Sequence, residues 1–366
     1  THFEYHCMED NLLKLDMLGH DDPSMIRMLE DLTGVNARAI PLDDPDTMSI
    51  FTSSKVLGFE NDELLGPTGA VAIPEFNTRF TRQMLIDTQP KDFNTLVRLS
   101  GFSHGTDVWL GNARELIVGG TASVLQTVGC RDDIMLYLIS MGLDPKMSFK
   151  IMEAVRKGKV KKGGFQEGWV EAMEEHGVPQ WYIESLAKIG YLFPKAHAVA
   201  YVMMAFRIAW FKVHEPLAFY ATFFTIRAKA FDAEFCCAGK EAVERKIHEI
   251  ENNKDATAVE QNLLVTLEVC YEFYLRGFHF DTIDIYRSDA SKFIITEGGL
   301  LPPLISVHGL GEAAAQDTVE KRKGKTFISV EEFSMCCSKL SKTHIEQLKA
   351  LGAFAGMAEP SQLTLF

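Results

Sequence analysis

The longest unbroken apolar run in the chain, Ala198–Phe206, lies within the segment Tyr191–Pro216. The run is about half as long as a membrane span requires, so it predicts a buried helix of a soluble domain. Pro194 suits the first turn of such a helix, and Pro216 is expected to stop it. The pattern therefore predicts one central core helix in this segment.

Cations border this predicted helix on both sides. Lys195 and His197 precede the apolar run, and Arg207 and Lys212 follow it. A buried helix with cationic ends is a rigid support on which an anion can bind. An ordinary core helix with basic ends explains the same pattern, and composition alone favours that explanation.

A shorter pattern near the start of the chain alternates with a period of two. Leu13, Leu15 and Met17 fall on one face of a predicted strand over 10–19, and Asp16 falls on the other. A carboxylate in this position can be a metal ligand at a nucleotidyl-transfer site, because Mg²⁺ ions there need carboxylate oxygens at fixed places. An Asp that faces solvent is the commoner explanation.

Most of the remaining pattern is helical, with one further alternating stretch. Helices are expected at Ser24–Thr33, after Pro41 and on both sides of residue 215, and residues 238–254 read as an exposed helix near a domain boundary. Phe278–Tyr286 alternates as a strand. The pattern is typical of a mainly α protein with small β elements (α+β).

A loop rich in glycine and polar residues is predicted over Gly101–Asn112. Ser103 and His104 lie in it, close to Trp109. Such a loop can bring backbone and hydroxyl donors close to a polar ligand. A capped turn between two helices is an equally good interpretation.

The densest basic run is Lys157–Gly164, which contains Lys161 and Lys162 and no acid. A flexible basic loop in an acidic protein is a candidate contact for a phosphate backbone. A solvated turn explains the run equally well.

A helix-hairpin-helix pattern follows at Leu304–Ala315. Its pattern positions are Val307, Gly309, Leu310 and Gly311. The glycines allow a tight turn whose backbone N–H groups can meet a DNA phosphate at a helix N-terminus. A plain helical hairpin is the alternative.

The last residues, Gln362–Phe366, form an apolar tail after a polar stretch. A tail of this kind can dock in a groove of a partner protein. A disordered end is the alternative.

Composition narrows the class of protein. The chain has 366 residues, a net charge of −13 and seven cysteines without CxxC or zinc spacing. These features argue against a uniformly basic nucleic-acid binder and favour reduced thiols in a cytosolic protein. No signal peptide or transmembrane segment is expected, and the absence of an initiator Met suggests a piece of a longer protein.

Several of these motifs, taken in order, resemble the C-terminal part of the replicative DNA polymerase III alpha subunit of the PolC type. The resemblance is carried by NLLKLDMLGHDDP, SHGTDVWLGNA, CRDDIMLYLI, FPKAHAVAY and HGLGEAA, and the terminal QLTLF resembles a peptide that docks on the bacterial sliding clamp. It extends along the whole chain.

The resemblance implies four parts. Residues 1–34 would end a nucleotidyltransferase-like palm, and residues 35–229 would be helical fingers. Residues 230–358 would bind duplex DNA, with the helix-hairpin-helix at about 304–325, and 359–366 would be the clamp-binding tail.

The resemblance also implies sites, which we state as expectations. Asp16 would be one of three aspartates that hold two Mg²⁺ ions, the other two lying upstream of this chain. The resemblance places the incoming deoxynucleoside triphosphate around Ser103 and His104 and around Tyr191–Tyr201, with Ser103 in the base pocket. Because Lys195, His197 and Arg207 border the buried helix, they are the candidates to neutralise the triphosphate. Primer-template DNA would contact Val307, Gly309, Leu310, Gly311, Lys161 and Lys162. The clamp would contact Gln362, Leu363, Leu365 and Phe366.

The expected activity is template-directed addition of deoxynucleotides to a primer 3′-OH in the bacterial cytoplasm, carried out with the upstream portion of the same protein. Two alternatives remain. The isolated chain can be a non-catalytic module that binds DNA and the clamp, because one aspartate cannot build a two-metal site. It can also be a helical scaffold whose hairpin binds only protein.

Overall fold

The computed structural model describes residues 2, 4, 7–8, 11–12 and 19–358. Helices dominate these residues and a single small sheet accompanies them, which confirms the predicted mainly α class with small β elements. The longer helices are α1 (Asp22–Thr33), α3 (Arg79–Thr88), α4 (Phe93–His104), α6 (Arg131–Ser140), α7 (Pro145–Arg156), α10 (Gln180–Lys188), α11 (Lys195–His214), α12 (Pro216–Ile226), α14 (Lys240–Asn252), α15 (Ala258–Leu275), α16 (Glu312–Arg322) and α18 (Lys342–Ala350).

Shorter elements complete the described chain. The short helices are α2 (Pro45–Ser49), α5 (Arg114–Val118), α8 (Lys159–Gly163), α9 (Trp169–Glu175), α13 (Ala233–Cys236) and α17 (Val330–Cys336). The strands are β1 (His279–Phe280), β2 (Ile294–Thr296) and β3 (Gly299–Leu301). In the sheet, β3 lies between the other two, parallel to β1 and antiparallel to β2.

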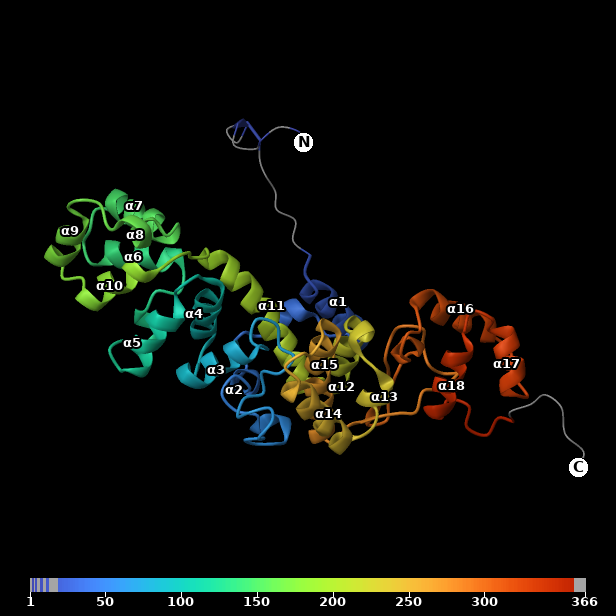
Figure 1. Ribbon diagram of the computed structural model, residues 1–366. Helices are drawn as coiled ribbons and strands as arrows, with labels where there is room; N and C mark the ends of the chain where they lie inside the picture. The colour runs from blue at the N-terminus through green and yellow to red at the C-terminus, as the bar shows by residue number, and fades with distance from the viewer. Residues whose placement is uncertain (1, 3, 5–6, 9–10, 13–18, 359–366) are drawn as a thin grey trace, which may run out of the picture.

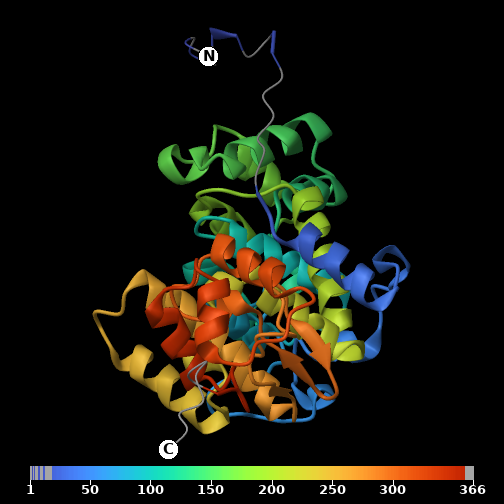
Figure 2. The same cartoon turned by 90° about the vertical axis from the view of Figure 1, so that its right-hand side faces the viewer.

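The molecule is elongated, and α11 lies near its middle (Figure 1). Helices α6–α10 gather at one end and α16–α18 at the other. Figure 2, turned by 90°, brings the second end to the front, with the strands beside these helices. Sites on the two ends are therefore separated by the central helices.

Helix α11 is the core helix that the apolar run predicts. It packs against α1, α2, α4 and α12, and Ala198, Val202 and Phe206 are buried. It is long and apolar enough to cross a membrane by length and composition, but these neighbours surround it and it contains charged residues. Its ends differ from the prediction: Pro194 is the N-cap and not in the first turn, and Pro216 begins α12 after a break at Glu215.

The C-terminal cation of α11 is not at the surface. Lys212 is completely buried, and its Nζ donates to the carbonyl of Gly69 at 2.8 Å, to the carbonyl of Val71 at 2.5 Å and to Glu272 of α15 at 2.9 Å. The hydroxyl of Tyr220 donates to the other Glu272 oxygen at 2.7 Å. Burial lowers the pKa of Lys212 to about 8, partly offset by Glu272. Lys212 is thus a core cross-link and not a free basic end.

A second charged contact ties α15 to α3. Arg82 of α3 donates to Glu268 at 3.0 Å, and both side chains are nearly buried. Together with the Lys212–Glu272 pair, this contact places α15 in the same core as α3 and α11. Core contacts therefore join the segments before and after residue 230. The domain boundary expected at residue 230 stays a prediction.

Two segments form different structures from those expected. Residues 157–164 do not form a flexible loop, because Val160 is buried and α8 packs on α7 and α10. The strand predicted over 278–286 is limited to β1. The Asp284 side chain accepts hydrogen bonds from the N–H groups of Tyr286 and Arg287, which turns the chain away from the sheet.

Helix α14 is the charged helix expected over 238–254, but it is not exposed on all sides. Val243, Ile247 and Ile250 are buried at helical spacing, and the helix packs along α15.

Candidate functional site

A row of rings lies beside the N-terminal half of α11; we call it the ring row. It starts at His20, just before α1, continues over Tyr201 and His197 of α11, and ends on Phe193 and Tyr191. Neighbouring ring centroids are 4.4–5.3 Å apart, within stacking range. Tyr191 is 40% exposed. The row presents ring surfaces at the edge of the core around α11.

His104 fixes one side of the ring row. Its ring centroid is 5.6 Å from Phe193 and 6.1 Å from His197. Its Nδ1 contacts the Ser100 carbonyl at 2.8 Å and the Ser103 hydroxyl at 3.1 Å, and its Nε2 lies 3.2 Å from Glu75. The structure therefore brings Ser103 and His104 to His197 and Tyr191, four of the six residues expected at the nucleotide.

Glu75 reaches His104 through an unusual backbone conformation. Its φ is +68°, in the left-handed region that non-glycine residues seldom occupy. Nearby, Ala72 also has positive φ, and its N–H donates to the Asn77 side chain at 2.6 Å. Strain of this kind persists where the surroundings enforce it, often at ligand sites. The left-handed turn holds the Glu75 carboxylate against the ring row.

His197 contributes an aromatic ring to the site and little positive charge. Burial and the neighbouring His104 lower the pKa of His197 below its ordinary value. At neutral pH its imidazole is therefore mostly uncharged. It can stack or exchange hydrogen bonds with a ligand, but it supplies little positive charge.

Lys195 is engaged at the start of α11. Its N–H donates to Asp132 at 2.7 Å, and its Nζ is 3.8 Å from Asp133. Both acids belong to α6. Lys195 thus joins α6 to α11, with part of its charge offset by acids that are already present.

Arg207 is the cation on α11 without such a partner. It is half-buried, and its Nε makes no hydrogen bond with any described residue. It lies ten residues beyond His197, about 15 Å along the helix axis. A half-buried guanidinium with an unpaired donor is ready to accept an anion.

Asp22 is an ionisable group buried next to the ring row. Its Oδ1 is 3.3 Å from His20, and its buried Oδ2 has no hydrogen-bond partner among the described residues. Burial raises the pKa of Asp22 to about 6; His20 opposes the rise and Glu75 adds to it. The folded chain therefore keeps this proton to a higher pH than the unfolded chain.

We expect Asp22→Asn to stabilise the chain at pH 7. Between about pH 4 and 6 the folded state binds more protons than the unfolded state, so wild-type stability falls as pH rises through that window. Asparagine does not ionise, so the stability of the variant does not fall in this window. Its free energy of unfolding should exceed that of wild type by about 2 kcal/mol at pH 7 and should equal it near pH 4. Urea unfolding at both pH values measures this, with the exposed Asp21→Asn as control. An equal gain at both pH values would contradict it.

The helix-hairpin-helix turn has the local geometry that its sequence predicts. Val307 and Leu310 are buried, and the Leu310 N–H donates to the Val307 carbonyl at 3.0 Å. Gly309 has a φ of +75°, which favours glycine. Gly311 has ordinary extended backbone and open space where a Cβ would stand. It is the N-cap of α16 and offers no side chain to the helix amides.

A second turn repeats the first at a spacing of 30 residues. Buried residues of the first turn and α16 match buried residues of the second turn and α18; the pairs are Val307 and Cys337, Leu310 and Leu340, Ala315 and Ile345, and Thr318 and Leu348. The Leu340 N–H donates to the Cys337 carbonyl at 2.9 Å, as in the first turn. Of these four pairs only Leu310 and Leu340 are identical, so the repeat is seen in the burial pattern and not in sequence identity.

The two turns differ at their helix N-termini. Where the first has Gly311, the second has Ser341, whose hydroxyl accepts from the His344 N–H at 3.2 Å. The His344 ring in turn accepts from the Ser341 N–H. The second helix is therefore capped by its own side chains, whereas α16 leaves its first amides for an external acceptor. The first turn is the better anion site.

Of the basic residues on α16 and α8, some are bonded within the fold and others are free to contact a ligand. Arg322, at the end of α16, donates to the Ile285 carbonyl at 2.6 Å and to the Ser288 carbonyl, so it supports the fold. Lys161 is 2.6 Å from Asp107, which docks α8 on the loop after α4. Lys162 is exposed and has no side-chain partner among the described residues.

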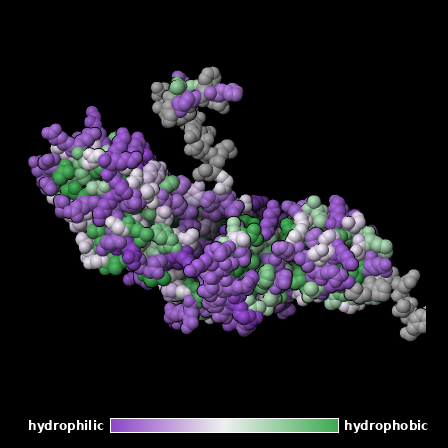
Figure 3. Space-filling model, viewed as in Figure 1, coloured by the Kyte–Doolittle hydropathy of each residue, from purple (hydrophilic) through white to green (hydrophobic). Residues whose placement is uncertain are grey.

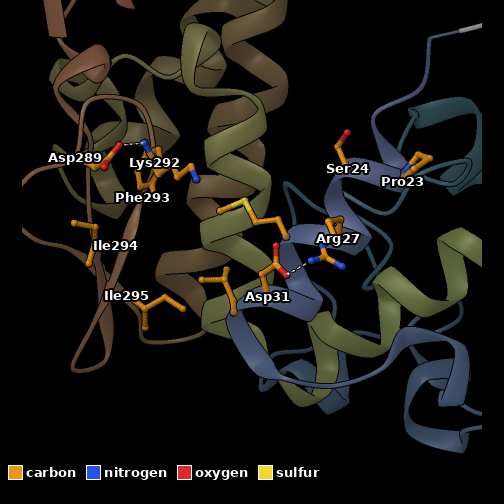
Figure 4. A pocket seen from close by; sticks show the side chains of 11 residues that line it. Pro23, Ser24, Arg27, Asp31, Asp289, Lys292, Phe293, Ile294 and Ile295 are labelled. Atoms are coloured by element: carbon orange, nitrogen blue, oxygen red, sulfur yellow. Dashed lines mark hydrogen bonds and ion pairs between the residues drawn. The ribbon is translucent and has the colours of Figure 1, made fainter. Parts of the chain in front are cut away.

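A cavity of about 700 Å³ lies elsewhere, between α1 and β2 (Figure 4). Arg27 and Asp31 form an ion pair at 3.1 Å on its α1 wall, and Ile294 and Ile295 line the opposite wall. It brings no expected site residue together. A cavity of about 640 Å³ borders the first hairpin turn, with His308 and Lys246 in its wall.

Some expected residues lie outside the described part of the chain. These are Asp16 and the tail residues Gln362, Leu363, Leu365 and Phe366. In the described part, no cluster of three His, Cys, Asp or Glu side chains could hold a metal ion. The seven cysteines are all described and all free.

Sequence reasoning missed His20 and Glu75 as members of the site. They come from separate segments, and although His20 lies in the motif NLLKLDMLGHDDP, only tertiary packing brings it to Tyr201. The positive φ of Glu75 has no sequence signal, because glutamate rarely adopts it.

Comparison with known proteins gives two family models. The bacterial DNA polymerase III alpha subunit finger domain matches residues 22–177, which include α1–α9. A helix-hairpin-helix motif model matches residues 277–363.

Relatives match along the whole chain. A DNA polymerase III PolC-type from Caldanaerobacter subterraneus subsp. tengcongensis is 57% identical over 367 residues, and those from Halalkalibacterium halodurans and Bacillus cereus are each 51% identical. All of the present chain is covered in each comparison, but it spans about a quarter of each relative's length, 25–26%.

Proposed function

Because the chain belongs to the PolC-type DNA polymerase III family, of whose members it spans about a quarter, we propose that it supplies the nucleotide-binding fingers and the duplex-binding part of a replicative polymerase. The reaction of the whole protein would be template-directed addition of deoxynucleotides to a primer 3′-OH. The single observation that supports this role best is the ring row beside α11, which carries an unpaired arginine.

We propose that the nucleotide binds along α11. Its base would lie against the ring row, near Ser103, His104 and Tyr191. Its triphosphate would extend toward Arg207, and Lys195 would add charge at the other end of the helix. The lowered pKa of His197 assigns that ring to stacking or hydrogen bonding. Phosphoryl transfer depends mainly on positioning and charge stabilisation, which these groups can provide.

We expect alanine variants of Lys195, His197 and Arg207 in the intact polymerase to raise the nucleotide KM or lower kcat, with Arg207→Ala the most severe at about tenfold or more in kcat/KM. Single-nucleotide incorporation measures this. The matched control is Arg27→Ala, an exposed arginine of α1 paired only with Asp31. Unchanged kinetics in all three variants would remove the proposed nucleotide site.

Primer-template DNA is the proposed partner of the hairpin region. The amides left open at the N-terminus of α16 would bind a backbone phosphate, with Val307 and Leu310 buried to hold the turn in place. Gly309 and Gly311 allow the close approach. Lys161 and Lys162 would contact DNA at the other end of the molecule.

Asp16 is the one residue of this chain that is proposed to bind magnesium. The described residues do not form a metal site, and one carboxylate does not bind two ions. We propose that Asp16 contributes one of several ligands to catalytic Mg²⁺, and that the remaining aspartates belong to the rest of the polymerase.

The tail Gln362–Phe366 is proposed to dock on the sliding clamp. We expect its deletion from the polymerase to abolish clamp binding and to leave distributive synthesis unchanged. Pull-down with purified clamp and primer extension without clamp measure the two effects. A deletion variant that still binds the clamp would place the anchor elsewhere.

A non-catalytic module that binds DNA and the clamp is the second candidate function for the chain by itself. It is favoured by the sequence, in which Asp16 is the one expected metal ligand, whereas a two-metal site needs several carboxylates. Incorporation assays on the isolated chain and on the intact polymerase separate the two. In either case we propose a cytoplasmic protein with no membrane partner.

A further inference from the structure

The end of the molecule formed by α7 and α8 is strongly basic, in contrast to the acidic chain as a whole. Between residues 145 and 165 there are seven basic side chains and one acid, whereas the chain has a net charge of −13. In Figure 3 this end of the molecule is mainly hydrophilic, with some hydrophobic residues between. A local positive field of this kind attracts polyanions whatever the net charge.

The basic side chains are of two kinds. Three are used within the fold: Arg156 and Lys157 contact Glu153, and Lys161 contacts Asp107. The other four are exposed and form no side-chain hydrogen bond or ion pair with described residues; they are Lys146, Lys150, Lys159 and Lys162. We call these four, together with Phe149, the lysine face. Its positive charge is not neutralised within the described chain.

An aromatic ring stands among these lysines. Phe149 is 50% exposed on α7, beside Lys150 and one turn from Lys146. Its ring borders a hollow of about 320 Å³ that Lys159 and Trp169 also line. An exposed phenylalanine between unpaired cations combines a stacking surface with phosphate contacts.

The lysine face is held rigidly. On its inner side, Ile151, Met152 and Val155 of α7 are buried, and Val160 anchors α8. Gly158 lies so close to Gly190 that an added Cβ would stand 2.4 Å from the Gly190 carbonyl oxygen. The backbone positions that carry the lysines are therefore fixed relative to one another without a ligand.

We propose that the lysine face binds single-stranded nucleic acid, with an unpaired base stacked on Phe149 and phosphates beside the four lysines. A duplex would offer no free base face to the ring, so an unpaired strand fits better. Helix α9 carries Glu171, Glu174 and Glu175, so the strand runs along α7 and α8 and avoids α9. This site lies at the opposite end from the hairpin turn (Figure 1) and does not depend on the proposed nucleotide site.

The test uses fluorescence anisotropy of the full chain with a labelled (dT)12 strand and with an abasic strand of equal length. We expect Phe149→Ala to weaken (dT)12 binding about tenfold and to leave the abasic strand unchanged, because only the stacking contact is lost. Phe149→Trp should keep the affinity, with its fluorescence quenched by (dT)12. The triple variant Lys150→Ala, Lys159→Ala and Lys162→Ala should reduce the salt slope by about 2.

Two controls isolate the site. Phe80→Ala removes a phenylalanine of similar exposure, 42%, on α3 and should leave (dT)12 affinity unchanged. Lys55→Ala removes an exposed lysine that is paired with Glu60, outside both proposed DNA-binding regions, and should also leave it unchanged. Equal (dT)12 affinity for Phe149→Ala and wild type would overturn the proposal. An equal loss of affinity of Phe149→Ala for (dT)12 and for the abasic strand would also overturn it. So would tighter binding of anionic lipid vesicles than of (dT)12.

Discussion

Glu272→Gln and Lys212→Met should each destabilise the chain by about 3–5 kcal/mol, the largest stability effects that we expect from single substitutions here. Each substitution leaves its partner buried with a charge and without its counter-ion. The Lys212→Met variant also leaves the carbonyls of Gly69 and Val71 without their donor. Urea unfolding of the purified chain measures the change in unfolding free energy.

The double variant Lys212→Met with Glu272→Gln tests the pairing itself. In the double variant neither buried charge remains. Its decrease in unfolding free energy should therefore be clearly smaller than the sum of the decreases in the two single variants. Lys323→Met breaks an exposed pair with Glu320 and is the matched control, with an expected effect below about 1 kcal/mol. Additive losses in the double variant would show that the two side chains act independently.

Gly311→Val should weaken binding of duplex DNA by tenfold or more, the largest functional effect that we expect in the hairpin region. The backbone of Gly311 is extended, and there is open space at its Cβ position, so a side chain there is compatible with the fold. That side chain would instead occupy the approach of a phosphate to the first amides of α16. Titration of labelled duplex across a salt series measures the affinity.

The hairpin repeat supplies the comparison for this prediction. Ser341→Gly, at the equivalent position of the second turn, removes a helix cap and should cost about 1 kcal/mol or less in stability. It should leave duplex affinity unchanged, since the second turn is not the proposed phosphate site. Equal affinity of Gly311→Val and wild type at every salt concentration would contradict the assignment of the first turn.

Features encoded within a few residues could be predicted from the sequence. The buried helix α11 follows from its apolar run, and the first hairpin turn follows from the spacing of Val307, Gly309 and Leu310. Helix α1 ends at Gly34 in the left-handed conformation, as its sequence indicates. In these cases the forces that form the structure act between neighbours in the chain.

Features that depend on distant partners could not be predicted. Lys212 was expected as one of the basic ends of the core helix, but its partner Glu272 lies 60 residues away in the sequence. The Lys157–Gly164 run was expected to be a loop, because it consists mostly of lysines and glycines. Its sequence does not show that Val160 is buried and anchors a short helix. The ring row combines rings from the segment before α1, from the segment before α11 and from α11 itself, and only tertiary packing brings His20 to the others.

The contacts of α11 have a mechanical consequence. The N-terminal half of this helix carries rings of the ring row, and its C-terminal end is fixed to α15 by the buried Lys212–Glu272 pair. The same continuous helix therefore sets the distance between the ring row and α15, and loss of the buried pair would loosen the support of the rings from a distance.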